Sequence, residues 1–126
     1  MINKNILILV IDDNKTMRRI VRTLLNQLGY NNVEEAEDGV SAFNMIKEKN
    51  YQLVISDWNM TPITGLELLQ QVRAVDAYKN LPFIMVTAES KMENIVEAKN
   101  AGANNYIVKP FSASTLETKL NAVLDK

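Results

Sequence analysis

The chain has 126 residues, of which 47% are hydrophobic and 23% charged, and its formal net charge is -1. This length corresponds to one domain that buries about two-thirds of its unfolded surface. The near-balance of 14 basic and 15 acidic residues excludes a global field that attracts nucleic acid or anionic membrane. Because cysteine and histidine are absent, disulfides, thiolate or imidazole zinc sites, Ser-His-Asp hydrolases and phosphohistidine donors are excluded as well.

Apolar runs and helical patterns alternate from the start of the chain. Ile6–Ile11 is a continuous apolar run, which is typical of a strand covered on both faces. A helix is predicted next, with Asn14 as its N-cap and Gly29 ending it in left-handed geometry. Helical spacing predicts that Arg18, Arg19 and Arg22 face solvent. The apolar stripe of this helix consists of Met17, Ile20, Val21, Leu24, Leu25 and Leu28.

The same alternation continues to the end of the chain. We predict strands over residues 32–37, 53–56, 83–86 and 106–108, the third entered through Pro82. The helices between them are indicated by apolar spacing, and the one over 91–101 ends at Gly102. The last helix has Ser114-x-x-Glu117 as a candidate capping box. The apolar positions of the second predicted helix are Val40, Phe43 and Ile46, and those of the third are Leu66, Leu68, Leu69 and Val72. Those of the last helix are Leu116, Leu120, Val123 and Leu124.

Five strand-then-helix units without a linker predict one doubly wound α/β domain over residues 1–126, with a five-stranded parallel sheet. Ligands of such sheets bind beyond the carboxyl ends of the strands. Polar residues end four of the apolar runs. A single one is ordinary helix-capping chemistry, but the convergence of all five predicts a phosphoryl-transfer site built from Asp12, Asp13, Asp57, Thr87 and Lys109.

The chemistry of these residue types supports that interpretation. A carboxylate can act as a nucleophile toward phosphorus, and Mg²⁺ prefers a few carboxylates together with water and phosphate oxygens. The three carboxylates and Lys109 sum to a charge of -2. Two like charges about 4 Å apart repel by roughly 4 kcal/mol at an effective dielectric of 20, so an incoming phosphoryl dianion needs the divalent ion.

Asp12-Asp13, Asp57, Thr87 and Lys109-Pro110 on successive strands resemble the receiver domain of two-component response regulators over the whole chain. The stretches Val54–Met60, Met85–Glu89 and Val108–Phe111 look like those of its single-domain chemotaxis members. The resemblance implies the flavodoxin-like strand order 2-1-3-4-5. It also makes the Lys109-Pro110 bond a candidate cis peptide.

The resemblance implies that Asp57 accepts a phosphoryl group from a histidine kinase. In the family, Mg²⁺ is held by the residues that match Asp13, Asp57 and the backbone carbonyl of Asn59, and Asp12 acts mainly through water. Thr87 and Lys109 match the residues on opposite sides of the phosphoryl group.

The resemblance also implies an output. Tyr106 matches an aromatic switch residue that responds when Thr87 moves toward the phosphate. Ile95, Tyr106 and Lys119 match a face that meets a flagellar motor protein. Asn59 and Glu89 match positions that tune the lifetime of the acyl phosphate.

Two features stand apart from that pattern. Helical spacing alone also allows Met92, Ile95 and Val96 to be core residues, which competes with an exposed Ile95. Receivers commonly have proline four residues after the acceptor, where this chain has Thr61, with Pro62 next. Thr64 stands where related loops often carry Asp, so the loop entering the third helix is expected to differ.

We therefore expect a cytoplasmic, monomeric chemotaxis regulator that is a signalling protein and not an enzyme, with Mg²⁺ as cofactor. The expected partners are a chemotaxis-type histidine kinase, a flagellar motor switch protein and a phosphatase, with no nucleic acid or membrane. A phosphate sink or a phosphorelay intermediate stays open within the receiver class. A Mg²⁺-dependent phosphohydrolase with an aspartyl-phosphate intermediate and a purely structural α/β module stay open outside it.

Overall fold

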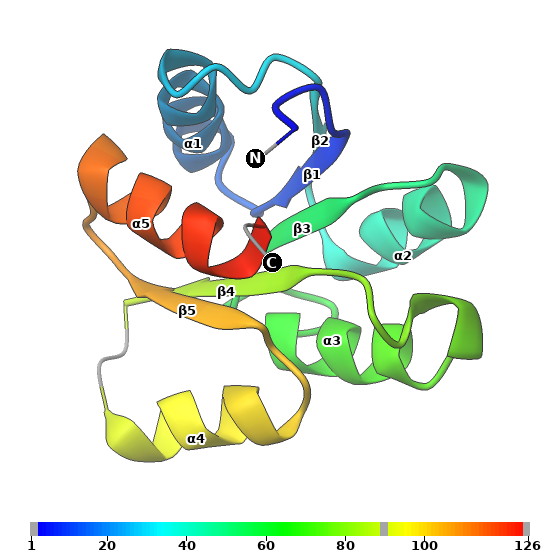
Figure 1. Ribbon diagram of the computed structural model, residues 1–126. Helices are drawn as coiled ribbons and strands as arrows, with labels where there is room; N and C mark the ends of the chain where they lie inside the picture. The colour runs from blue at the N-terminus through cyan, green and yellow to red at the C-terminus, as the bar shows by residue number, and fades with distance from the viewer. Residues whose placement is uncertain (1–2, 89–90, 125–126) are drawn as a thin grey trace.

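Within residues 3–88 and 91–124, which this computed structural model describes, five parallel strands form one sheet in the order β2-β1-β3-β4-β5 (Figure 1). This order confirms the flavodoxin-like topology expected from the resemblance. The strands lie inside or within one residue of the predicted runs. They are β1 (Ile8–Ile11), β2 (Val33–Ala36), β3 (Leu53–Asp57), β4 (Phe83–Thr87) and β5 (Asn105–Val108).

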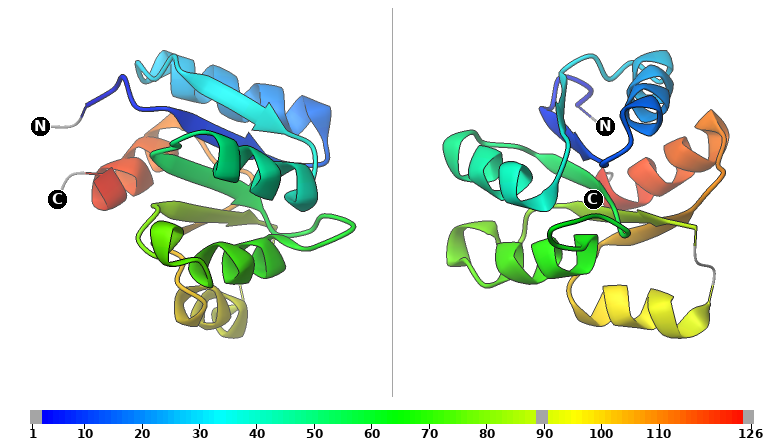
Figure 2. Two further views of the ribbon diagram at one scale, coloured as in Figure 1. Left: turned by 90° about the vertical axis from the view of Figure 1, so that its right-hand side faces the viewer. Right: turned by 180° about the vertical axis from the view of Figure 1, so that it is seen from behind.

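Helices cover both faces of the sheet. In Figures 1 and 2, α1 and α5 lie on one face, and α2, α3 and α4 lie on the other. A short 3-10 helix, η1 (Asp76–Tyr78), follows α3. The α-helices are α1 (Lys15–Gln27), α2 (Gly39–Glu48), α3 (Gly65–Arg73), α4 (Met92–Asn100) and α5 (Ala113–Leu124).

The continuous apolar run at the start of the chain is explained by this double cover. Ile8 and Val10 point into the core layer that includes α1 and α5, whereas Leu9 and Ile11 point into the layer of α2, α3 and α4. Successive side chains of a strand point to opposite faces. A strand with helices on both faces therefore needs apolar residues at every position.

Helix caps confirm one sequence prediction and correct another. The Asn14 side chain accepts a hydrogen bond from the backbone N–H of Met17, and Gly29 follows α1 with φ 97°. The predicted capping box of α5 is wrong because Ser114 lies inside the helix. Ser112 takes the cap position, and its hydroxyl accepts from the backbone N–H of Thr115 at 3.2 Å.

Two predicted core positions are on the surface. Ile20 of α1 is 44% exposed and Val40 of α2 is 47% exposed. In α2 the buried residues are Gly39, Ala42 and Ile46, so two small residues and only one of the three predicted apolar positions are fully buried. Helical spacing finds the apolar stripe but not which edge of it meets the neighbouring layer.

The Tyr30 hydroxyl is buried without a hydrogen-bond partner among the described residues. Burial, and secondarily the charge of Glu117, raises the pKa of this phenol above its ordinary value. We expect Tyr30→Phe to raise the free energy of unfolding by about 1 kcal/mol, because a buried unsatisfied hydroxyl costs about 1–3 kcal/mol. Urea denaturation checks this, and a lower midpoint for the variant would contradict it. The Lys4 ammonium lies 5.4 Å from the Tyr30 ring centre, and Phe keeps that contact.

None of the helices in the described part of the chain is long and apolar enough to cross a membrane.

Candidate functional site

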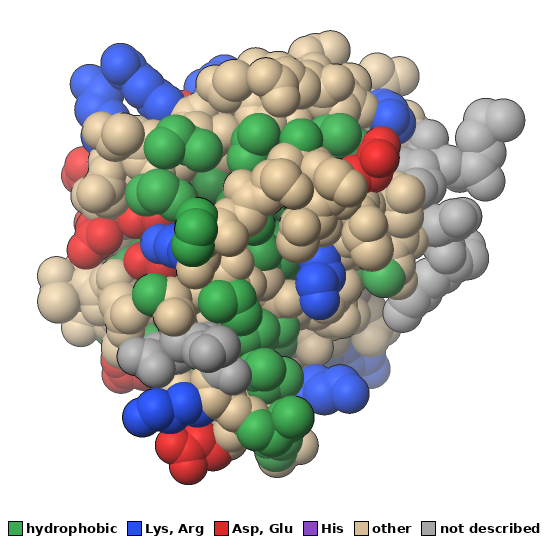
Figure 3. Space-filling model, turned by 90° about the vertical axis from the view of Figure 1, so that its left-hand side faces the viewer, with side chains coloured by type: hydrophobic (Ala, Val, Ile, Leu, Met, Phe, Trp, Pro, Cys, Tyr) green, Lys and Arg blue, Asp and Glu red, His purple; other side chains and the backbone are tan. Residues whose placement is uncertain are grey.

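The carboxyl ends of the strands bring the predicted polar residues to one edge of the sheet. Asp57 is the last residue of β3 and pairs with Val86, and Thr87 is the last residue of β4 and pairs with Val108. Asp12 directly follows β1, and its N–H donates to the Ala36 carbonyl at 3.2 Å. The side of the molecule seen in Figure 3 has acidic side chains gathered next to a basic one.

Three carboxylates form one cluster at this edge. Asp12, Asp13 and Asp57 each offer an oxygen atom, and these atoms all lie within 4.8 Å of one another. Asp12 is 4% exposed and Asp57 is 6% exposed, whereas Asp13 is open to solvent. Asp12 Oδ1 also accepts a hydrogen bond from the backbone N–H of Asn14 at 2.9 Å. The cluster is therefore walled by protein on one side and reachable from water on the other.

Lys109 supplies the counter-charge. Its Nζ lies 2.8 Å from Asp57 Oδ1 and 3.5 Å from Asp12 Oδ2. The backbone N–H of Lys109 donates to the Thr87 carbonyl at 2.8 Å, which places the ends of β4 and β5 side by side. Thr87 is fully buried. The Lys109-Pro110 bond is cis, as expected from the resemblance.

Burial and neighbouring charges oppose each other at Asp57. Burial raises the pKa of the Asp57 carboxyl, and the Asp12 carboxylate adds to this, whereas Lys109 and a backbone hydrogen bond from Trp58 lower it; the net pKa is raised. Burial lowers the pKa of Lys109, but the hydrogen bonds and charges of Asp57 and Asp12 outweigh burial, so its net pKa is raised. Lys109 is therefore a cation at neutral pH, and it only partly compensates the buried acids.

The donor set fits a hard divalent cation. Three clustered carboxylates, one of them exposed, are ligands that suit Mg²⁺, which usually keeps several waters. With a net charge of -2, the four charged groups are also left unbalanced without such an ion. Asn59 lies two residues after β3 in an exposed loop, where its backbone carbonyl is the remaining predicted ligand.

Neutralising the acceptor is expected to stabilise the metal-free protein. A carboxyl whose folded pKa is raised binds its proton more tightly in the folded state, so stability falls as pH rises from the unfolded value of about 3.9 through the folded pKa. We expect Asp57→Asn to unfold at a higher temperature than wild type in EDTA at pH 7, because the variant has no carboxylate to bury. The advantage should disappear below about pH 4. Thermal scans across this pH range measure it, and a less stable variant at pH 7 would count against it.

The loop between β3 and α3 carries the two residues, Thr61 and Thr64, that stand apart from the family pattern. The Thr61-Pro62 bond is cis. Thr64 is the N-cap of α3, and it forms a capping box with Glu67: the Thr64 hydroxyl accepts from the Glu67 N–H, and the Glu67 carboxylate accepts from the Thr64 N–H. Glu89, the second position predicted to tune the acyl phosphate, lies outside the described residues.

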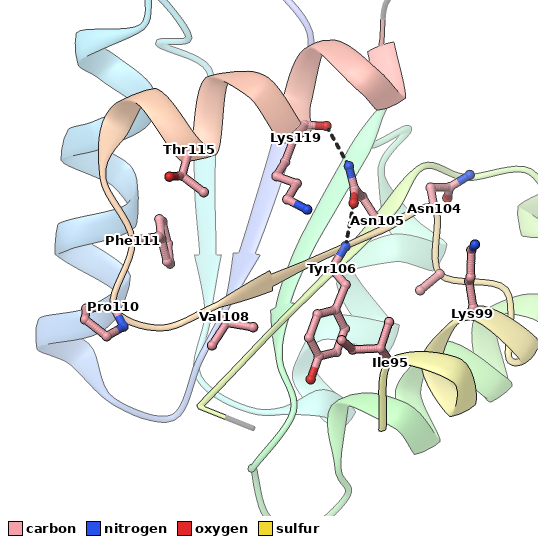
Figure 4. A pocket seen from close by; sticks show the side chains of 11 residues that line it. Ile95, Lys99, Asn104, Asn105, Tyr106, Val108, Pro110, Phe111, Thr115 and Lys119 are labelled. Carbon is pink, nitrogen blue, oxygen red and sulfur yellow. Dashed lines mark hydrogen bonds between the residues drawn. The ribbon is translucent and has the colours of Figure 1, made fainter. Parts of the chain in front are cut away.

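The three residues of the predicted partner face line one groove (Figure 4). Ile95 of α4, Tyr106 of β5 and Lys119 of α5 border this groove of about 570 Å³, and the Tyr106 ring lies beside Ile95. Tyr106 is buried and Ile95 is half-buried. The alternative that Met92, Ile95 and Val96 are all core residues is wrong, because Met92 is 72% exposed and Val96 is 45% exposed.

Sequence reasoning missed several residues around the site. Arg18 was expected in solvent, but its side chain is only 13% exposed and donates to the Asp12 carbonyl and to Glu35. Gly65 packs against the backbone of Asp57. Neither residue carries a local sequence signal, because each contact depends on how its helix packs against the ends of the strands.

Known proteins resemble this chain over nearly its whole length. A family model described as the response regulator receiver domain matches residues 8–121. Chemotaxis protein CheY-3 of Vibrio cholerae serotype O1 is 50% identical over 125 residues, covering 99% of this chain and 96% of that protein. Chemotaxis protein CheY of Pseudomonas aeruginosa is 46% identical over 119 residues, covering 94% and 96%.

Solved structures agree with these sequence matches. The chemotaxis response regulator CheY4 of Vibrio cholerae superposes with a TM-score of 0.88 at 37% identity, covering 95% of this chain and 99% of that one. A response regulator from Chloroflexus aurantiacus superposes with a TM-score of 0.91 at 29% identity, covering 97% and 99%. The chain therefore belongs to the response regulator receiver domain family and is homologous to the CheY chemotaxis regulators.

Proposed function

We propose that this protein accepts one phosphoryl group on Asp57 from a histidine kinase, in a Mg²⁺-dependent reaction, and signals as a chemotaxis regulator. The observation that carries the proposal is the buried Asp57 carboxylate with the Lys109 ammonium at 2.8 Å and two further acids within reach. Family membership supports it, because receiver domains are signalling modules rather than conventional enzymes.

The transfer step requires little covalent chemistry from the protein. An Asp57 carboxylate oxygen attacks phosphorus, the P–N bond to the donor imidazole breaks, and the imidazole keeps the electron pair and takes up a proton. Lys109 is already bound to Asp57 Oδ1 and is close enough to pass to a phosphoryl oxygen. The Thr87 hydroxyl would donate a hydrogen bond on the other side of the group.

Receiver domains use Mg²⁺ in this acidic pocket. When bound, the ion neutralises the excess negative charge and draws phosphoryl oxygens toward the site. We assign Asp13 and Asp57, with the Asn59 carbonyl, to hold it, and Asp12 to act through water. The exposure of Asp13 and burial of Asp57 suit these roles, because the ion must be reachable and the acceptor shielded.

A Mg²⁺-dependent phosphohydrolase is the competing function. Such enzymes place a second acid two residues after the nucleophile to protonate the leaving group. This chain has Asn59 there, which cannot donate a proton in that way. Asn59 therefore favours a receiver, in which the phosphoryl group stays on Asp57, over a phosphohydrolase that turns over many substrate molecules.

Intact-mass spectrometry with a small acyl phosphate donor tests the proposal. We expect wild type to gain about one phosphoryl group per chain in Mg²⁺ and none in excess EDTA. Asp57→Asn should gain none, whereas the exposed Asp76→Asn of η1 should behave as wild type. Undiminished labelling of Asp57→Asn, or of wild type in EDTA, would sink the assignment. Catalytic release of phosphate from external esters would identify a phosphohydrolase.

We assign the output, which is phosphorylation-dependent binding of a partner protein, to the groove bordered by Ile95, Tyr106 and Lys119. The β4 strand that ends at Thr87 pairs with β5, which carries Tyr106. A movement of Thr87 toward the phosphoryl group would therefore affect the strand next to Tyr106, which borders the groove. As homologues are chemotaxis regulators, the proposed partner is the flagellar motor switch.

Binding to a motor switch protein tests the output. We expect beryllofluoride, which mimics the phosphoryl group, to increase the affinity of wild type but not of Asp57→Asn. Tyr106→Ala should still accept a phosphoryl group and lose most of this increase. Equal affinity in all these states would favour a phosphate sink or a relay intermediate.

A further inference from the structure

Arg18 links the acidic cluster to the neighbouring strand. From α1, its Nη1 donates a hydrogen bond to the backbone carbonyl of Asp12 at 2.7 Å. Its Nε donates to Glu35 Oε1 at 3.0 Å. The side chains of Arg18 and Glu35 are 13% and 24% exposed, so both bonds are largely shielded from water. A guanidinium has donors in a rigid fork and can bind two fixed acceptors at once.

These bonds hold the backbone of Asp12 from both sides. Its N–H donates to the carbonyl of Ala36 on β2, and Glu35 directly precedes Ala36 on the same strand. Through Arg18, the Asp12 carbonyl is tied to β2 as well. That carbonyl belongs to the planar peptide unit that also contains the Asp13 nitrogen. Its orientation therefore affects the position of both neighbouring acids.

We propose that Arg18, held by Glu35, is a positioning residue for the divalent-ion site, because it fixes the peptide plane between Asp12 and Asp13. The proposal rests on the proposed function only in that these acids bind Mg²⁺. Groups that orient metal ligands from behind typically change metal affinity by about 10–100-fold when they are removed.

The sign of the effect separates positioning from simple electrostatics. Removing a cation near the site would, by charge alone, strengthen Mg²⁺ binding. Losing the fork that holds the Asp12 carbonyl would weaken it, because the acids would then have to be ordered by the ion. Weaker binding after a neutral substitution at Arg18 therefore cannot arise from charge.

Arg22 provides a matched control on the same helix. Its Nη1 donates to Glu35 Oε2 at 2.9 Å, and among the described residues it makes no hydrogen bond to Asp12. Its side chain is 45% exposed. Arg18→Met and Arg22→Met each remove one cation and one bond to Glu35, but only the first releases the Asp12 carbonyl.

Isothermal titration calorimetry with MgCl₂ tests the proposal on the full chain without a phosphoryl donor. We expect Arg18→Met to bind Mg²⁺ about tenfold more weakly than wild type. Arg22→Met should bind as wild type or slightly more tightly. The Mg²⁺ affinity of Arg18→Lys, which keeps the charge but has a single donor nitrogen, should lie closer to that of Arg18→Met than to that of wild type. If Arg18→Met does not fold, Arg18→Lys takes its place in the comparison.

Phosphoryl transfer gives a second measurement that a loss of folding would not reproduce. The Mg²⁺ concentration for half-maximal labelling of Arg18→Met should rise about tenfold, while its rate at saturating Mg²⁺ stays within a few-fold of wild type. Equal Mg²⁺ affinity of Arg18→Met and Arg22→Met would overturn the positioning role alone. Wild type that binds Mg²⁺ but accepts no phosphoryl group would instead refute the proposed function, and absence of Mg²⁺ binding by wild type would overturn both.

Discussion

Lys109→Met is expected to slow phosphoryl transfer to Asp57 by roughly 10²–10³-fold, the usual loss when one preorganised group that stabilises transferring charge is removed. In the described part of the chain, Lys109 is the cation that forms ion pairs with carboxylates of the acidic cluster, at 2.8 Å from Asp57 and 3.5 Å from Asp12. Its loss changes the charge of the cluster from -2 to -3. An incoming phosphoryl group then meets stronger electrostatic repulsion and lacks the ammonium group that would bind one of its oxygens.

Stopped-flow labelling with a small acyl phosphate at saturating Mg²⁺ measures this rate. Lys79→Met is a suitable control, because Lys79 is exposed and follows η1, away from the cluster. It should label at the wild-type rate. Raising Mg²⁺ should not restore Lys109→Met, since the metal ligands are intact and the missing group contacts the phosphoryl group. A Lys109→Met rate within threefold of wild type would remove Lys109 from the transfer step.

Gly65→Ala is expected to destabilise the fold by about 3 kcal/mol or more, at the upper end of overpacking effects. Gly65 is the first residue of α3, and a Cβ there would overlap the backbone carbonyl oxygen of Asp57. It would also lie 3.0 Å from the sulfur of Met85. The Asp57 carbonyl belongs to the central sheet and cannot shift without moving the acceptor, so labelling should decrease together with stability.

Gly39→Ala is the matched control. Gly39 is likewise the first residue of a helix after an N-cap, but a Cβ there would meet side-chain atoms of Ile63, at 2.5 and 2.7 Å. The Ile63 side chain is half-buried and can rotate. The gain in helix propensity of about 1 kcal/mol offsets that contact, so we expect a net change of about 1 kcal/mol or less. Urea denaturation compares the two variants, and equal midpoints would contradict the backbone overlap.

The strands β1, β3 and β4 were the most predictable, because every residue in them is buried. Ile8 to Ile11 alternate between the two core layers, and every position is apolar. The polar residues that follow such runs must reach the same edge of a parallel sheet. That is why the cluster of Asp12, Asp13 and Asp57 and its contact with Lys109 could be predicted before the structure.

Helix faces and caps were less predictable. The α5 cap is at Ser112 and not at Ser114, and Ile20 and Val40 are at the surface. Two candidate caps two residues apart differ little in local propensity, and an apolar stripe is wider than its contact with the sheet. Met92 and Val96 show the same limit, because helical spacing cannot tell a core stripe from an exposed apolar surface.

The sequence by itself determined the α/β class, the edge at which chemistry occurs and the residue types that perform it, because each follows from burial pattern and strand direction along the chain. Only the tertiary structure decided which supporting groups hold that site. Arg18 reaches Asp12 because β2 places Glu35 beside it, and Gly65 must lack a side chain because α3 begins against the Asp57 carbonyl. The physical reason is the same in both cases: these contacts depend on how a helix packs against the strands, and a long cation or a glycine carries no local sign of which partner it meets.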